Sequence, residues 1–423
     1  MKKMNRWAYA VIGVVTLLFA GLIYAWSVMS KSIAASRPDW TATQVSLTFT
    51  IVMALFCTGG LIAGLLSKKI NPKLYIIASG VFFAAGFFIA SLTGDSPALL
   101  YIGFFLASMT QSSLATLYLG FGVLCGLGAG VAYNAVMGTI CAWFPDKQGL
   151  ISGILLMGFG LSSFIIGKVY AAVTPSDGSD QWKMTFRILG IVVLVVMLIC
   201  FNFFVKPSED YKVPGAAAKK VVKEPALDIP PTQMVKKPAF WLYYIWAILL
   251  SAAGLVLVSQ ASGIATQVGP NVSDGNIATV VGLISILNGI GRVIFGAIFD
   301  KKGYRVAMTL DMIIMIVGAL VLILALSTGN FLFIVLGFLI GGLAYGGVMP
   351  TNSAIISDFF GRTNYPVNYS LINTNLIIAS FASTIAGKLY DASQSYMAPV
   401  MMMIGVTVVG FIVSLGIRRP KAK

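Results

Sequence analysis

The chain contains no histidine and little charge of either sign. Without histidine, Ser-His catalysis, histidine proton relays and zinc sites built on imidazole are excluded. Charged residues make up 10% of the 423 residues, whereas a soluble domain carries about 25%. Hydrophobic residues make up 58%, and the mean hydropathy is +0.90. Because apolar runs of about 18 residues or more recur throughout, the sequence predicts a polytopic helical membrane protein.

Reactive side chains are also scarce. The four cysteines all lie in apolar segments, which favours packing roles over disulfides or metal ligands: Cys57, Cys125, Cys141 and Cys200. No paired carboxylates and no activated nucleophile are recognisable, so we expect no enzyme, no cofactor and no metal site. The basic N-terminus, Met1 to Arg6, precedes a long apolar run without a small-residue cleavage site, which predicts an uncleaved first span.

Twelve apolar segments are long enough to cross a bilayer, which predicts an all-α protein with twelve transmembrane helices. The predicted spans are 7–29, 42–67, 75–93, 116–142, 149–173, 183–205, 240–266, 276–299, 306–327, 331–357, 367–390 and 397–417. An even number of spans places both termini on one side. Most of the 29 Lys and Arg residues fall in loops on that side, so the positive-inside rule predicts cytoplasmic termini in the cytoplasmic membrane. This distribution explains the net charge of +15 without any nucleic-acid partner.

A Lys- and Pro-rich segment at 206–238 divides the chain, which predicts an N-terminal six-helix half at 1–205, a cytoplasmic linker and a C-terminal six-helix half at 239–423. Two short matches support a duplication. Residues 64–73 resemble 296–305, and residues 167–171 resemble 387–391, each pair being six spans apart. Such pseudo-symmetric bundles are typical of secondary transporters, which hold substrate near the membrane midplane.

A second, local repeat lies between the third and fourth spans. Residues 86–104 are nearly repeated at 103–121, an offset of 17 residues. We expect an enlarged hairpin or a longer third helix there, and assign it no function.

Arg292 lies within the apolar span 276–299, which contains no acidic residue. An arginine deep in a membrane helix costs about 2.5–3.5 kcal/mol on insertion scales, so its retention indicates a function. The planar guanidinium matches a carboxylate, and Asn288 lies one helical turn earlier on the same face. The pattern predicts an organic-anion site at Arg292. The alternative is a structural role, in which Arg292 binds backbone carbonyls or Asp311.

Other polar residues within the spans have two interpretations each. Asp311 either carries a coupling proton or forms a structural bond with basic residues of the adjacent loop. Lys168 and Lys388 either extend to the membrane interface or attract anions to the outer opening. Glycines are frequent in the fourth and tenth predicted spans, which indicates close helix packing and not nucleotide binding.

Several motifs resemble known transporter sequences. The loop Gly296-x-x-x-Asp300-Lys301-x-Gly303-x-Arg305 is similar to that of the major facilitator superfamily, although its first-half copy has Lys68 in place of the aspartate. The resemblance implies a cytoplasmic latch built from Asp300, Lys301, Arg305 and Asp146. Three further segments resemble the oxalate/formate antiporter family, which is related to the monocarboxylate transporters: Trp143-Phe-Pro-Asp146-Lys-Gln-Gly149, Pro238-Ala-Phe-Trp241 and Asn288-x-x-x-Arg292.

This resemblance covers nearly the whole chain and implies a carrier of small carboxylates that works by rocker-switch alternating access. It implies that Arg292 binds the carboxylate and that Tyr24, Tyr133 and Tyr345 line the cavity. Where the oxalate carrier has a second cation, this chain has Leu376, next to Asn373, Thr374 and Asn375. One cation suits a monoanion such as lactate, pyruvate or formate better than oxalate.

The implied partners are a small carboxylate anion, a counter-anion or a proton, and the lipid bilayer, with the carrier a monomer. The absence of histidine and of a central acid favours anion exchange, or a proton that travels with the substrate. An efflux pump for another small solute is one alternative, although such pumps bury acids in their first six spans. A transport-fold nutrient sensor is another, although the 206–238 segment is short for a signalling domain.

Overall fold

Residues 5–40, 42–92, 114–175, 177–208, 211 and 228–420 are described by the computed structural model. Within them, twelve helices are long and apolar enough to cross a membrane, and each coincides with a predicted span to within a few residues. The predicted all-α class and its twelve spans are therefore confirmed. The local repeat at 86–121 falls largely on residues 93–113, which lie outside the described residues.

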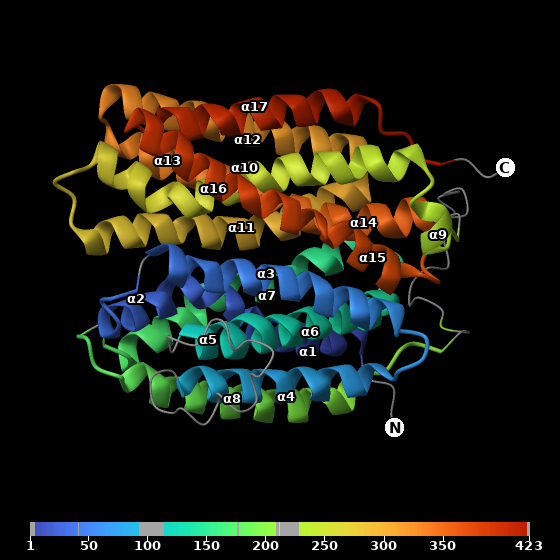
Figure 1. The fold of residues 1–423 in the computed structure, drawn as a ribbon. Coiled ribbons are helices and arrows are strands. Elements are labelled where there is room, and N and C mark those ends of the chain that lie inside the picture. Colours follow the sequence, from blue (N-terminus) through green and yellow to red (C-terminus); the bar gives the residue numbers. More distant parts are fainter. Residues whose placement is uncertain are drawn as a thin grey trace. The chain divides into compact units, whose positions relative to one another are not determined.

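The chain forms two compact units, whose helices Figure 1 draws in colours that follow the sequence. Unit 1 comprises Met1–Ile140 and Leu161–Lys206, and unit 2 comprises Cys141–Gly160 and Pro207–Lys423. The predicted linker thus begins where unit 1 ends, but the segment Cys141–Gly160 groups with the later helices. The assignment of 1–205 and 239–423 to separate six-helix halves stays a prediction.

Unit 1 is built around α6, against which α1, α3 and α4 pack. Its elements are α1 (Arg6–Ala20), η1 (Gly21–Ala25), α2 (Trp26–Ser36), α3 (Ala42–Leu65), α4 (Pro72–Ser91), α5 (Leu114–Leu117), η4 (Tyr118–Cys125), α6 (Gly126–Ile140), α8 (Gln181–Cys200) and η6 (Phe201–Phe203). A further helix, α7 (Gln148–Val173), begins in unit 2 and ends in unit 1.

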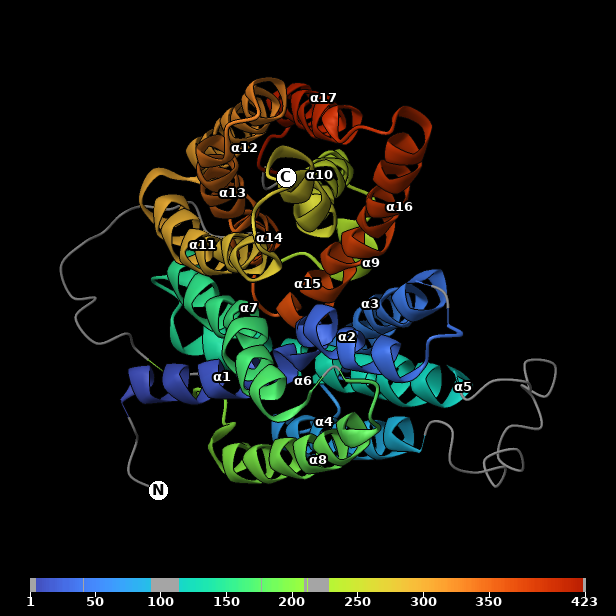
Figure 2. The same cartoon turned by 90° about the vertical axis from the view of Figure 1, so that its left-hand side faces the viewer.

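Unit 2 is arranged around α10, which Figure 2 shows among its neighbours α13, α16 and α17. Its elements are η5 (Cys141–Trp143), α9 (Pro231–Met234), α10 (Pro238–Val268), α11 (Asp274–Lys302), α12 (Tyr304–Thr328), α13 (Phe331–Tyr345), α14 (Val348–Phe360), α15 (Tyr365–Asn373), α16 (Asn375–Ser393) and α17 (Met397–Leu415). Buried apolar side chains of α10 to α13, α16 and α17 form its core.

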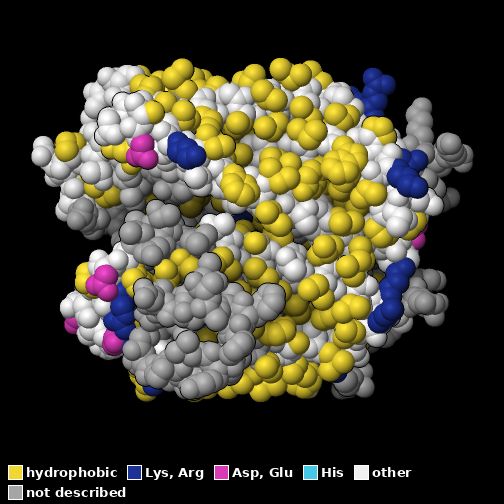
Figure 3. Space-filling model, viewed as in Figure 1, with side chains coloured by type: hydrophobic (Ala, Val, Ile, Leu, Met, Phe, Trp, Pro, Cys, Tyr) yellow, Lys and Arg dark blue, Asp and Glu magenta, His cyan; other side chains and the backbone are white. Residues whose placement is uncertain are grey.

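Each unit exposes large hydrophobic side chains along its helices, as a lipid-facing surface requires. Figure 3 shows them over the middle of each unit, with Lys and Arg side chains gathered mainly toward the helix ends. This distribution agrees with a multi-pass membrane protein.

Glycines let the helices approach closely, as the sequence predicted. A Cβ on Gly130 of α6 would overlap the carbonyl oxygen of Phe56 on α3, and one on Gly126 would lie 2.8 Å from the carbonyl oxygen of Val52. In unit 2, a Cβ on Gly318 of α12 would lie 2.8 Å from the backbone nitrogen of Gly341 on α13. The predicted packing role is confirmed for Gly126, Gly130 and Gly341, and it depends on backbone contact that any side chain would prevent.

Several of the described membrane-spanning helices are irregular. The first contains the 3₁₀ segment η1, and the fourth contains the π-helical segment η4. The tenth span breaks at Gly346–Gly347, where Pro350 cannot donate a backbone hydrogen bond to the preceding turn, and the eleventh breaks at Thr374. Broken helices expose backbone groups and are common where transporters bind substrates. Tyr24, Tyr345, Asn373 and Asn375 all lie in or beside these irregular segments.

Candidate functional site

Arg292 lies in the middle of α11 in unit 2 and is 7% exposed. Its Nη1 donates a hydrogen bond to the carbonyl oxygen of Leu156 on α7. Its buried Nε has no partner in the described structure, and no described acidic side chain forms an ion pair with it. The structural alternative for Arg292 was a bond to backbone carbonyls or to Asp311. The bond to a backbone carbonyl is present, and the bond to Asp311 is absent. One buried N–H of the guanidinium is left for a ligand.

A stripe of glycines on α7 brings this helix against α11. A Cβ on Gly153 would overlap the carbonyl of Arg292, and a Cβ on Gly160 would lie 3.2 Å from Nη1 of the same arginine. Gly149 makes a similarly close backbone approach to Gly296. The guanidinium therefore rests against backbone, and larger side chains on this stripe would displace it. The sequence did not indicate this role of α7, because these three glycines resemble ordinary packing residues.

Asn288 and Tyr345 lie close to Arg292. Asn288 is buried one turn earlier on α11, and its carbonyl oxygen lies against Gly346 at the α13–α14 break. Tyr345 ends α13, is buried, and lies within electrostatic range of Arg292. Its ring covers the Cα of Gly254 on α10, where no side chain would fit. The structure thus brings three of the predicted site residues together in unit 2.

A second polar cluster in unit 2 contains Asn373 and Asn375. Tyr243 donates a hydrogen bond to Oδ1 of Asn352 at 2.7 Å, and Nδ2 of Asn352 lies 3.4 Å from Oδ1 of Asn373. Asn375 is fully buried, and neither its Oδ1 nor its Nδ2 has a partner among the described residues. Tyr243 and Asn352 were not predicted, although Asn352 was visible as a polar residue within an apolar span.

Tyr24 and Tyr133 belong to unit 1. Tyr24 lies in η1 with its ring 6.2 Å from that of Phe49, and Tyr133 lies buried in α6 with its ring 5.1 Å from that of Phe56. Both pairs meet edge to face, an arrangement typical of aromatic packing. A role in lining a cavity stays a prediction for both tyrosines.

Asp300 at the end of α11 caps the beginning of α7. Its Oδ1 accepts the backbone N–H of Gly149 at 2.9 Å, and its Oδ2 accepts that of Leu150 at 2.8 Å. These N–H groups belong to the first turn of a helix, where they have no intrahelical acceptor and where the helix dipole favours a negative charge. The other three residues of the predicted latch are exposed or bonded locally: Lys301, Asp146 and Arg305, whose Nε donates to the hydroxyl of Tyr304.

We expect Asp300→Ala to lower the free energy of unfolding by about 1–3 kcal/mol, because two partly buried backbone N–H groups would lose a charged acceptor. Thermal unfolding in detergent measures the effect. Asp391→Ala, which removes an exposed carboxylate on α16, serves as the matched control. Equal melting temperatures for Asp300→Ala and the control would contradict the capping role.

Arg362, between α14 and α15, was missed by the sequence analysis. Its Nη2 donates to the carbonyl oxygen of Pro145 at 2.6 Å, and its Nε donates to Oγ of Ser357 at 3.2 Å. Burial lowers the pKa of Arg362, while the carboxylates of Asp146, Asp358 and Asp300 oppose that shift. The arginine remains charged and connects the segment after η5 to the end of α14.

Lys168 and Asp311 had alternative interpretations. The ammonium of Lys168 lies 4.5 Å from the ring centroid of Phe164, a local cation–π contact. Asp311 is 1% exposed, and neither carboxylate oxygen has a hydrogen-bond partner among the described residues. The structural bond between Asp311 and basic residues of the adjacent loop is therefore absent, and that interpretation was wrong.

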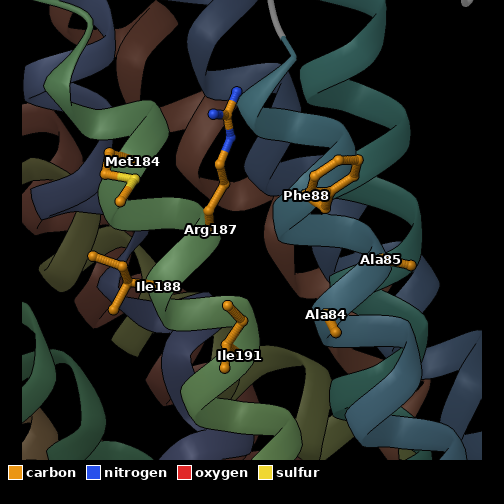
Figure 4. Close-up of a pocket in the computed structure, with 7 residues that line it drawn as sticks. All are labelled: Ala84, Ala85, Phe88, Met184, Arg187, Ile188 and Ile191. Carbon is orange, nitrogen blue, oxygen red and sulfur yellow. The ribbon is translucent and has the colours of Figure 1, made fainter.

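An open pocket of about 570 Å³ lies between α4 and α8 of unit 1. Figure 4 shows its lining residues: Ala84, Ala85, Phe88, Met184, Arg187, Ile188 and Ile191. Its one charged side chain, Arg187, donates from Nε to Oγ of Ser91 at 3.0 Å. Most of its large apolar residues are exposed, so the pocket belongs to the lipid-facing surface and not to a substrate site.

Residues 8–384 match the sequence model of the major facilitator superfamily. The chain belongs to this superfamily. Several curated relatives match most of its length. It is 24% identical over 377 residues to the uncharacterized MFS-type transporter YhjX of Escherichia coli (strain K12), covering 89% of this chain and 86% of the relative. It is 25% identical over 380 residues to the oxalate:formate antiporter of Oxalobacter formigenes, covering 85% of this chain and 80% of the relative.

The fold also matches solved structures. The proton:xylose symporter XylE bound to 6-bromo-6-deoxy-D-glucose aligns with a TM-score of 0.71 at 13% identity, covering 98% of this chain and 96% of that chain. This likeness concerns the fold alone. The superfamily match identifies this chain as a membrane transporter of small solutes and not an enzyme. The match to the oxalate:formate antiporter supports the predicted resemblance to that family.

Proposed function

We propose that this transporter carries a small monocarboxylate, such as formate, lactate or pyruvate, which binds to Arg292. The proposal rests on the hydrogen-bond and ion-pair partners of this arginine. Two basic side chains are buried among the described residues, Lys183 and Arg292. Lys183 forms an ion pair with Asp180 at 2.9 Å. Arg292 has no acidic partner and an unused N–H, so an anionic ligand would complete its coordination.

The preference for a monoanion rests on the surroundings of the eleventh span. Leu376 is buried where the oxalate carrier has its second cation, and the neighbouring Asn373 and Asn375 are neutral. A neutral amide can donate a hydrogen bond to a carboxylate without adding charge. A dianion such as oxalate would therefore keep one carboxylate without a cationic partner, which is costly in a low-dielectric site.

The proposed carrier lies in the cytoplasmic membrane with both termini in the cytoplasm. The concentration of Lys and Arg in loops on the side of the termini supports this orientation. Binding of the anion would neutralise Arg292, and the loaded carrier would then change conformation more readily than the empty one.

Uptake of radiolabelled formate, lactate, pyruvate and oxalate into proteoliposomes tests the proposal, with unlabelled lactamide and lactate as competitors. We expect uptake of at least one monocarboxylate, little uptake of oxalate, and inhibition by lactate but not by its neutral amide. Vesicles without protein correct for passive entry of the acids. Absence of uptake for all four anions, or equal inhibition by lactamide, would overturn the proposal and favour another solute.

The substitution Leu376→Lys tests the selectivity separately. A second cation is expected to raise oxalate uptake relative to formate by about tenfold or more, the equivalent of about 1.4 kcal/mol. Leu376→Met, which keeps an apolar side chain of similar volume, is the control and should leave the ratio unchanged. An unchanged ratio in a folded Leu376→Lys protein would contradict the proposed basis of selectivity.

A further inference from the structure

Asp311 is the one acidic residue that is buried among those the structure describes. It lies about two turns after the start of α12 at Tyr304, inside a membrane-spanning helix. Neither Oδ1 nor Oδ2 accepts a hydrogen bond, and no described basic side chain is within ion-pair distance. An ionised carboxylate without partners costs many kcal/mol in an apolar environment, so the neutral acid is the form compatible with this arrangement.

The elements packed against α12 offer Asp311 no cationic partner. These elements are α10, α11, α13, α14 and α17. Their titratable side chains are Tyr243 and Tyr244 on α10, Asp274, Arg292, Asp300, Lys301 and Lys302 on α11, Tyr345 on α13 and Asp358 on α14, while α17 carries none and α12 itself adds Tyr304 and Arg305. Of these side chains, Tyr243 interacts electrostatically with Asp311.

The break between α13 and α14 connects Asp311 to the candidate anion site. A Cβ on Gly347 would lie 2.6 Å from Oδ2 of Asp311, so this carboxyl rests directly on the backbone of the break. A Cβ on the adjacent Gly346 would lie 2.8 Å from the backbone nitrogen of Arg292 and would overlap the carbonyl oxygen of Asn288. Two consecutive glycines therefore lie between the carboxyl group of Asp311 and the backbone of α11 at Arg292, whose guanidinium extends to α7.

We propose that Asp311 is a proton-binding site that couples proton movement to transport at Arg292. The coupling part of this inference rests on the proposed carboxylate function. In each cycle the ionised carboxylate accepts one proton from the aqueous phase on one side and releases it on the other. One monocarboxylate anion and one proton then move together, so no net charge crosses the membrane. The neutral acid is compatible with close packing of the carboxyl group against Gly347, whereas the ionised form requires water to reach α12.

Infrared spectroscopy of the purified protein tests proton binding without any substrate. At about pH 8 the exposed carboxyl groups are ionised, so a remaining carbonyl band of a protonated carboxylic acid is expected to come from Asp311. The band should disappear in Asp311→Asn and persist in Asp391→Asn, which removes an exposed acid. Absence of the band in the wild type, or its persistence in Asp311→Asn, would overturn the proposal.

Transport tests the coupling. Because an amide resembles a neutral carboxyl group, Asp311→Asn should fold with an unchanged melting temperature and still exchange labelled for unlabelled pyruvate across the membrane. Net uptake driven by a pH difference of one unit should lose its accumulation of about tenfold, which corresponds to about 1.4 kcal/mol. Full pH-driven accumulation in Asp311→Asn, or equal loss of exchange and net uptake, would overturn the coupling. If the wild type carries none of the four anions, the carboxylate proposal fails, and the infrared result alone decides the proton site.

Discussion

Arg292→Ala is expected to reduce uptake of the transported carboxylate about 100-fold or more, because removing one partner of a buried charge pair costs about 2–5 kcal/mol. The substrate anion would then enter an apolar region without a cation. Arg292→Lys should retain part of the activity, since lysine keeps the charge but loses the planar fork that binds a carboxylate through two donors. Initial uptake rates in proteoliposomes, compared at equal amounts of reconstituted protein, measure both effects.

Arg187→Ala is the matched control for this series. Arg187 is also an arginine of a membrane-spanning helix, but it lines the lipid-facing pocket and binds Ser91. Its removal should leave uptake close to the wild-type value. Wild-type uptake by a folded Arg292→Ala protein would show that the arginine has only the structural contact with Leu156.

Gly130→Val is expected to prevent stable folding of unit 1. A Cβ at this position would overlap the carbonyl oxygen of Phe56 and lie 2.7 Å from the backbone nitrogen of Gly60. Both atoms belong to the backbone of α3, so no side-chain rotation can relieve the overlap and the two helices must separate. Overpacking typically costs about 1–3 kcal/mol, and this contact should exceed that range. Melting temperature and the yield of monodisperse protein in detergent measure the loss.

Gly405→Val provides the control for the glycine substitution. Gly405 lies on α17, and a Cβ there would meet no heavy atom within 4 Å. The same glycine-to-valine change on an open helix face should alter the melting temperature little, because the helix propensity of valine is only slightly more favourable than that of glycine. A Gly130→Val protein as stable as Gly405→Val would show that α3 and α6 can separate at small cost.

The number and positions of the spans could be predicted because hydrophobicity over about 18 to 20 residues is a local property of the sequence. Arg292, Asn288 and Tyr345 lie close together at α11 and the α13–α14 break, and their role in binding substrate stays a prediction. Arg292 stood out because a charge inside an apolar segment is costly wherever the segment lies. The breaks at Gly346–Gly347 and Thr374 were not predicted, since glycine and asparagine also occur in continuous membrane helices.

The partners of these residues could not be predicted, because they come from helices distant in the sequence. Leu156 and Gly160 of α7 contact Arg292 across more than 130 positions, and Asp300 caps that same helix. The sequence alone favoured a loop salt bridge for Asp311, because arginine and lysine residues lie nearby along the chain. The fold instead turns this side chain into the bundle and against Gly347, away from those loop residues.

Composition and hydrophobic runs alone determined that this protein is a twelve-span, all-α membrane protein with a buried arginine, because the bilayer imposes length and polarity on each helix separately. Only the tertiary structure decided which buried polar groups are satisfied. Arg292 obtains a backbone carbonyl from α7 and keeps one unused donor, while Asp311 obtains no partner. Whether a buried charge is paired depends on contacts between helices, and those contacts are set by close backbone packing at glycines, which hydrophobicity does not encode.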